Sequence, residues 1–471
     1  MNEWAFQSAT DLANAIKNKK ISSADLLEIY IERTNRLNPK INAIITTDFD
    51  TARKKAKKAD KALEAGENWG PLHGLPITIK DNLEVIGMPC TAGSPDLKDY
   101  VPSRNADVVQ ALLDAGAIVF GKTNLPLFGN DFQTYNKIHG QTNNPWNVNR
   151  TPGGSSGGSA AAISAGLTAL EIGNDIGGSI RHPANFCGIY GHKPTHGIVP
   201  DRGIIPPLPG IFTGEYTVNV DITVNGPLAR SPEDLDLIMG LITRPERPDR
   251  KAWKIKLPPP RRKTLKEYRI ALWLDDPACP VDIRVSERIK RVADALATAG
   301  AKVEEKKPDI SFSRSFEIFT SLLNGILGQS APENIFNKWI ASEPGLPQET
   351  SEYKSSQIRG AIQRHRNWLM VDAERQIMRQ KWADFFTDFD ILLCPTSPTT
   401  AFPHDHGSWF ERTINVNGSD LPYSNILGWA GLTNVVLLPS TIAPMGLSSN
   451  GLPVGVQIVA PYLEDRTSIH L

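Results

Sequence analysis

Two runs rich in glycine and serine, with a stretch of small apolar residues between them, constrain this chain more than any other feature. The first run covers residues 151–159 and contains Ser155, and the second covers residues 173–183 and contains Ser179. Glycine allows tight turns in which backbone N–H groups and a hydroxyl approach a reacting group closely. The alanine-rich segment predicts a closely packed helix over residues 159–171. The sequence therefore predicts two serines, in two glycine-lined loops, on either side of one helix.

Apolar segments with helix and strand periodicity alternate along the whole chain. Residues 106–115 predict an amphipathic helix that leads into an apolar strand. Further along, a helix predicted over residues 284–298 lies between two strands. The predicted strands cover residues 75–80, 117–120, 268–274, 301–305, 391–393, 435–438 and 454–459. This alternation predicts an α/β fold, with residues 1–471 forming a single domain around one large mixed sheet.

Four parts of this predicted domain differ in composition. Residues 1–65 form an N-terminal helical segment, and residues 66–240 form the core that carries both serine runs, over 151–183. Residues 265–390 are mostly helical and are expected on the substrate side. Residues 391–471 are expected to return strands to the core sheet. The basic, proline-rich residues 244–264 predict a surface linker.

Charge and cysteine content exclude several classes of partner. Lysine plus arginine and aspartate plus glutamate both number 51, so the net charge is zero. This balance argues against a nucleic-acid or anionic-membrane partner. The four cysteines are far apart, which favours a reducing compartment, and we expect a cytoplasmic protein. No signal pattern and no apolar run of about 18 residues is present, so no membrane span is expected.

Three motifs resemble cofactor or metal sites and are rejected. Residues 116–123 match the phosphate-binding pattern G-x4-G-K-[ST], but a predicted helix precedes them, so Gly116 is better read as the end of that helix. Two histidine pairs have metal-like spacing: His192 with His196, and His404 with His406. Prolines interrupt or precede both pairs and indicate loops. We therefore expect no metal and no other cofactor.

Residues 153–157 match the pattern G-x-S-x-G of a nucleophile elbow, which would make Ser155 the nucleophile. That elbow needs a preceding strand, and residues 143–152 do not predict one. A Ser-His-Asp hydrolase with His404 or His406 as the base therefore stays as an alternative.

Lys80 offers a different base, since it ends the apolar strand at 75–80. A serine hydroxyl needs an adjacent base to act as a nucleophile, and a lysine serves if burial keeps it neutral. The glycine-rich turn around Ser179 can also converge several backbone N–H groups into an oxyanion hole. The candidate donors are Ile176, Gly177, Gly178 and Ser179.

The combination of motifs resembles the amidase signature family. Ser155 and Ser179 are 24 positions apart, as in that family, and Lys80 in Gly74–Asp81 matches its lysine. Supporting motifs cover most of the chain: Gly121–Asn124, Asn144–Asn147, Gly188–Pro194, Gly226–Arg230, Pro395–Thr396 and Gly451–Gln457. The resemblance implies one α/β/α domain around a twisted mixed sheet of about eleven strands.

The resemblance also implies a Ser–cisSer–Lys triad. Ser179 is the expected nucleophile, Ser155 the bridging serine in a cis peptide with Gly154, and Lys80 the base. Supporting residues are expected at Ser156, at Asn174, where the family usually has threonine or serine, and at Asp175 and Arg181, which are expected to pair. Asn174 can still form hydrogen bonds, so we expect altered support rather than lost chemistry.

The predicted activity is hydrolysis of a carboxylic amide through a serine acyl-enzyme, on apolar, aryl, cyclic or oligomeric amides. Phe132, Tyr135 and Phe212 are hypothetical pocket residues. The alternatives within the family are an amide-forming acyltransferase and an amidotransferase subunit. A small-molecule amide is the only partner expected. The sequence leaves open the substrate, the oligomeric state, for which a homodimer is one option, and whether the native chain extends past Leu471.

Overall fold

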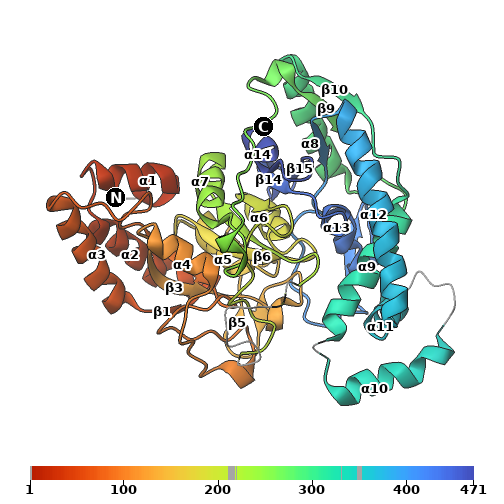
Figure 1. The fold of residues 1–471 in the computed structure, drawn as a ribbon, viewed down its shortest axis with the longest axis horizontal. Helices are drawn as coiled ribbons and strands as arrows, with labels where there is room; N and C mark the ends of the chain where they lie inside the picture. The colour runs from red at the N-terminus through yellow and green to blue at the C-terminus, as the bar shows by residue number, and fades with distance from the viewer. Residues whose placement is uncertain (1–2, 210–217, 219, 330, 347–352) are drawn as a thin grey trace.

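The computed structural model describes residues 3–209, 218, 220–329, 331–346 and 353–471 (Figure 1). Its largest sheet consists of β6 (Glu171–Asp175), β7 (Tyr190–Lys193), β8 (Val224–Ala229), β9 (Arg269–Leu272), β10 (Lys302–Glu305), β11 (Ile391–Cys394), β14 (Ser440–Leu447) and β15 (Pro453–Val459). The order is β10-β9-β11-β15-β14-β7-β8-β6. The β9 pairs are parallel and the pairs from β11 through β15 to β6 are antiparallel. The predicted α/β class with a large mixed sheet is confirmed.

A second sheet joins the first at β6. It has three strands, β1 (Ile44–Thr47), β2 (Pro76–Lys80) and β3 (Ile118–Thr123), in the order β1-β3-β2. Strand β2 packs against β6, so the ends of these two strands come close together. Two short hairpins, β4 (Tyr135–Asn136) with β5 (Gly140–Gln141) and β12 (Thr413–Val416) with β13 (Ser419–Pro422), complete the strands of the described residues.

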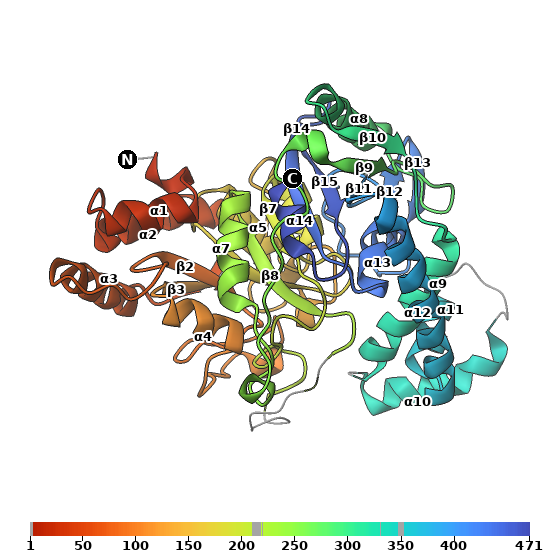
Figure 2. The same ribbon diagram turned by 45° about the horizontal axis from the view of Figure 1, so that its top comes forward.

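Helices surround these sheets. Their bounds are α1 (Ala9–Lys17), α2 (Ser23–Ile41), α3 (Phe49–Glu64), α4 (Asp107–Asp114), α5 (Gly157–Ser164), α6 (Arg181–Cys187), α7 (Pro232–Ile242), α8 (Ile283–Thr298), α9 (Phe312–Gly328), α10 (Glu333–Ser342), α11 (Tyr353–Ala361), α12 (His365–Asp388), α13 (Leu427–Val435) and α14 (Asp465–His470). Figures 1 and 2 show α1–α3 at one end of the molecule and α9–α12 at the other. None of the helices in the described ranges has the length and apolar character needed to cross a bilayer.

Local sequence explains where several helices begin. Ser22 and Ser231 accept hydrogen bonds from the backbone N–H groups of Asp25 and Asp234, which caps α2 and α7. Gly116 follows α4 with a φ of +96°, the left-handed conformation that ends helices, and β3 comes next. The phosphate-loop match at residues 116–123 therefore runs into a strand rather than a helix, as expected.

Two sequence predictions are wrong. The helix predicted over 159–171 ends at Ser164, because Gly166 adopts a left-handed φ of +69° and the chain then enters β6. The strand predicted over 435–438 is instead the end of α13 and the turn after it, where Leu437 has a φ of +65°. A short apolar run suits a buried helix end as well as a buried strand, which is why periodicity did not separate them.

Candidate active site

Lys80 is the last residue of β2, and its side chain is completely buried, with 0% exposed. Its Nζ atom lies 2.8 Å from Ser155 Oγ, 2.9 Å from Ser156 Oγ and 2.7 Å from Asn174 Oδ1. A neutral amine has two N–H donors and one lone pair, so these three polar partners satisfy it completely. β2 and the glycine-rich loops thus place a buried lysine against Ser155 and Ser156 of the first run.

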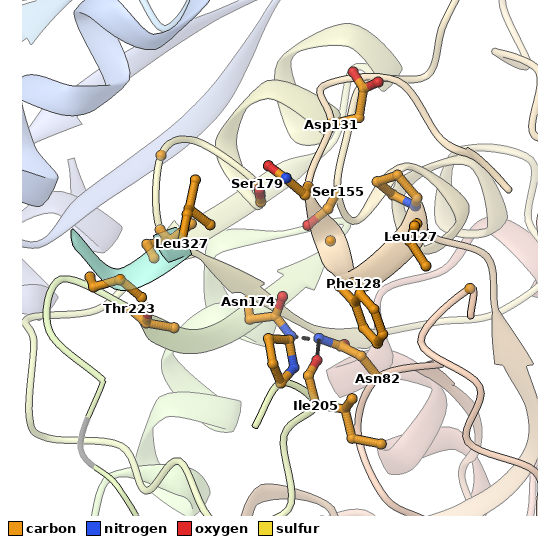
Figure 3. Close-up of a pocket in the computed structure, with 18 of the residues that line it drawn as sticks. Asn82, Leu127, Phe128, Asp131, Ser155, Asn174, Ser179, Ile205, Thr223 and Leu327 are labelled. Atoms are coloured by element: carbon orange, nitrogen blue, oxygen red, sulfur yellow. Dashed lines mark hydrogen bonds between the residues drawn. The ribbon is translucent and has the colours of Figure 1, made fainter. Parts of the chain in front are cut away.

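A chain of amides fixes the orientation of Asn174. The carbonyl of Ile205 can only accept, so Asn82 Nδ2 donates to it at 3.0 Å. Asn174 Nδ2 in turn donates to Asn82 Oδ1 at 2.9 Å, which leaves Asn174 Oδ1 to accept from Lys80 (Figure 3). The lone pair of a neutral Lys80 is therefore left for one of the two serine hydroxyls. Asn82 was not predicted, although it follows Lys80 by only two positions.

Burial decides the charge of Lys80. Desolvation lowers the pKa of Lys80 to about 7, against a usual value of 10.5, and the carboxyl groups of Asp175 and Glu171 oppose this only in part. Near neutral pH a large fraction of Lys80 is therefore unprotonated. Such a lysine can take a proton from a hydroxyl that hydrogen-bonds to it.

Ser155 and Ser179 line the same cavity and lie next to each other in Figure 3. The peptide between Gly154 and Ser155 is cis. The two runs also touch through the backbone, because the N–H of Ser156 donates to the carbonyl of Ser179 at 3.1 Å. The two serines, Ser156, Asn174 and Lys80 thus form one cluster.

The turn between β6 and α6 lines part of the cavity. Ile176, Gly177 and Ser179 line it, whereas the N–H of Gly178 donates to Asp175 Oδ1 at 2.8 Å. Of the four donors predicted for an oxyanion hole, Gly178 is therefore engaged elsewhere. Gly178 has a φ of +114°, and a Cβ atom there would lie 2.3 Å from the His182 ring, so the turn requires glycine.

Asp175 and Arg181 form a buried ion pair behind this turn, with Nη2 and Oδ1 2.8 Å apart. Burial alone would raise the pKa of Asp175, but the charge and hydrogen bonds of Arg181 outweigh it and hold this pKa well below its usual range. Arg181 also donates to Gln457, Thr433 and the Ala430 carbonyl. The pair ties the serine turn to α13 and β15.

The cavity in front of the serines has a volume of about 830 Å³. Phe132 and Tyr135, both predicted as pocket residues, line it, whereas Phe212 lies outside the described residues. The other large apolar and aromatic side chains that line the cavity come mainly from the loop after β3 and from α9 and its neighbours. They include Leu127, Phe128 and Leu327 (Figure 3), and also Leu323, Ile326, Tyr353, Trp409 and Phe410.

One polar cluster in the cavity wall was not predicted. Asp131 accepts from Arg412 Nη1 at 2.7 Å and from the Tyr423 hydroxyl at 2.8 Å. Arg412 also donates to the Tyr135 hydroxyl at 2.8 Å. About 280 residues separate the two charges, so no local pattern could have paired them. The charge of Arg412 is neutralised inside the wall.

The histidines of the rejected motifs lie apart from the serines. His192 is on β7 and hydrogen-bonds to Thr441 and Asp465. His404 and His406 are not among the cavity residues, and His406 stacks on Tyr135 with ring centroids 3.9 Å apart. Within the described ranges, histidine, cysteine, aspartate and glutamate form no group of three that could hold a metal ion.

Comparison with known proteins identifies the family of this chain. A family model described as Amidase matches residues 25–469. The chain belongs to the Amidase family. As a member of the amidase signature family it is an amidohydrolase, an enzyme that acts on amides.

Relatives within this family differ in their reactions. The chain is 34% identical over 469 residues to an indoleacetamide hydrolase of Bradyrhizobium diazoefficiens, covering 97% of this chain and 84% of the relative. It is 30% identical over 487 residues to one of the subunits of the glutamyl-tRNA(Gln) amidotransferase of Trichodesmium erythraeum, covering 97% and 95%. A solved 6-aminohexanoate cyclic dimer hydrolase, complexed with substrate, superposes with a TM-score of 0.75 at 26% identity and covers 99% of this chain and 97% of that one.

Proposed function

We propose that this amidase hydrolyses its substrate through an acyl-enzyme on Ser179, with Ser155 and Lys80 as the proton relay. The observation that carries the proposal is the 2.8 Å contact between the buried Lys80 Nζ and Ser155 Oγ, in the cavity that also holds Ser179. A serine hydroxyl becomes a nucleophile only with such a base nearby. The alternative Ser-His-Asp arrangement has no comparable support, since neither serine hydrogen-bonds to a histidine within the described ranges.

The relay accounts for each proton. Neutral Lys80 accepts the proton of Ser155, and Ser155 accepts that of Ser179 as its Oγ attacks the amide carbon. The N–H groups of Ile176, Gly177 and Ser179 stabilise the charge that develops on the carbonyl oxygen. The relay then runs backwards and protonates the leaving nitrogen, so the C–N bond breaks. Water attacks the acyl-enzyme by the same route, releasing the acid and restoring Ser179.

The lining of the cavity favours aryl and other apolar amides. Phe128, Phe132 and Trp409 offer aromatic surface, and the charge of Arg412 is already paired with Asp131. An aromatic amide buries large apolar area in such a pocket. The relationship to an indoleacetamide hydrolase supports an arylacetamide substrate, and that to a cyclic dimer hydrolase keeps cyclic amides as a second class to test.

The test measures ammonia released from phenylacetamide by the purified chain. We expect Ser179→Ala to lose activity by at least about 10³-fold. The matched control is Ser164→Ala at the far end of α5, whose hydroxyl donates to the Cys187 carbonyl and touches no reacting group. This control should stay within about twofold of wild type. Equal activity of Ser179→Ala and wild type would contradict the proposal.

The same assay separates the two family alternatives. In the acyltransferase reaction an added amine intercepts the acyl-enzyme, so the product is a new amide rather than the free acid. An amidotransferase subunit needs partner chains for its reaction. Release of free acid by the purified chain, with no amide formed when an amine is added, supports hydrolysis over both.

A further inference from the structure

One acid in the cavity wall has no positive partner. Three aspartates line the cavity, and two are paired: Asp131 with Arg412, and Asp175 with Arg181. The third, Asp201, is only 5% exposed and forms no ion pair with any described residue. The residues outside the described ranges contain no lysine, arginine or histidine that could supply one. Asp201 is therefore a buried carboxyl group facing a ligand cavity without a side-chain cation of its own.

Asp201 lies close to the catalytic cluster. Asn225 on β8 donates through Nδ2 to Asp201 Oδ1 at 3.2 Å. In the ladder between β6 and β8, Asn225 is directly opposite Asn174, the residue that accepts from Lys80. Side chains of directly opposed residues project to the same face of a sheet, about 5 Å apart. One cross-strand pair, Asn225 and Asn174, thus connects the Asp201 carboxyl group to the residue that supports Lys80.

Among the described residues, Asn225 donates to the Asp201 carboxyl group, and the other polar neighbours are engaged elsewhere or are acids themselves. The N–H of Asp201 donates to Glu246 at 2.8 Å, and the adjacent Arg202 is committed to Asp107. Burial, with the nearby Glu246 carboxyl adding to it, raises the pKa of Asp201 well above its usual value and so favours the neutral acid in the empty cavity. A donor group on a bound ligand would favour the carboxylate, which accepts from it. The hydroxyl of Thr223, which also lines the cavity (Figure 3), has no hydrogen-bond partner among the described residues. A buried polar group of this kind is costly unless a partner satisfies it.

We propose that Asp201 is a specificity residue, which accepts a hydrogen bond from a donor group on the substrate at the end remote from the amide. This rests on the proposed function, and it narrows the substrate class to aryl amides whose ring carries an N–H or O–H donor. A site built to hydrogen-bond a substrate donor discriminates against the analogue that lacks it, because its own polar group is then buried without a partner.

Two primary amides of equal size test the assignment: 4-aminophenylacetamide and 4-methylphenylacetamide. The leaving group of both is ammonia, so the ring must occupy the cavity as the acyl part. We expect wild type to prefer the amino compound in kcat/KM by about tenfold. In Asp201→Leu this preference disappears or reverses, and in Asp201→Asn, which keeps an acceptor oxygen, part of it remains. The matched control is Asp276→Asn, a similarly buried acid outside the cavity that pairs with Lys307, and its ratio should equal that of wild type.

The outcomes separate this inference from the proposed function. If wild type hydrolyses both amides through Ser179 at equal rates, or if Asp201→Leu keeps the wild-type ratio, Asp201 is not a specificity residue while the hydrolytic function stands. If neither amide is hydrolysed, the proposed hydrolysis of arylacetamides is wrong, and so is the assignment of Asp201, which rests on it. A 4-methoxy analogue preferred over the amino compound would overturn the acceptor role, since a methoxy group only accepts. Thermal melting of each variant confirms that it is folded.

Discussion

The pH dependence of kcat/KM for an uncharged amide reports the protonation of Lys80. In its fully buried site the pKa of Lys80 falls from 10.5 to about 7, which corresponds to about 5 kcal/mol against the charged form. Only neutral Lys80 can accept the proton of Ser155. The neutral fraction is about 0.1 at pH 6 and about 0.9 at pH 8, so we expect kcat/KM to rise about tenfold over this range and to level off above it.

The assay follows ammonia release from phenylacetamide in buffers of constant ionic strength. The control is Lys80→Met, which should lose activity by about 10²- to 10⁴-fold and lose the pH-dependent rise. A flat wild-type profile from pH 6 to 8, or a midpoint above pH 9, would refute the reasoning. So would an identical rise in Lys80→Met, because the titrating group would then be another buried residue, such as Lys193, whose pKa burial also lowers to about 7.

Three further variants test the groups around the relay. Arg181→Met leaves Asp175 buried without its cation, and urea denaturation should show a loss of about 3–5 kcal/mol in the free energy of unfolding. Asn174→Ala removes an acceptor that favours the charged lysine, so the pH midpoint of kcat/KM should move below that of wild type. Burial raises the pKa of Glu171 to about 8, so this group makes wild-type stability fall by about 1.4 kcal/mol per pH unit between about pH 4.5 and 8. Glu171→Gln should therefore gain unfolding free energy relative to wild type across that interval, and a constant difference would contradict the burial argument.

Much of the fold follows from local sequence. Apolar strands such as β2 and β15, and helices capped by Ser22 and Ser231, carry periodicity and capping signals that identify them without tertiary information. The end of α5 at Ser164 and the turn after α13 were not predicted, because left-handed conformations at Gly166 and Leu437 decide both. Leucine carries no local signal for such a conformation, which tertiary packing imposes.

The candidate site also contains residues that the sequence predicts and residues that only the fold reveals. Lys80, Ser155 and Ser179 belong to glycine-rich or strand-end motifs, so their sequence context marked them. Asp131 and Arg412 come from segments far apart in the chain, and only the fold brings them together. Asp201 was not predicted either. It stands out because it has no ion-pair partner among the described residues, and the sequence alone does not show which charges are paired. The single-domain organisation and the homodimer stay predictions.

The most direct test of the account identifies the serine that becomes acylated. Wild type, Ser155→Ala and Ser179→Ala are treated with a fluorophosphonate, a reagent that reacts with activated serine hydroxyls, and the modified peptide is mapped by mass spectrometry. The relay predicts one adduct, on Ser179, slow labelling of Ser155→Ala and none at the site in Ser179→Ala. An adduct on Ser155, or labelling of Ser179→Ala at the wild-type rate, would contradict the assignment of Ser179 as the nucleophile.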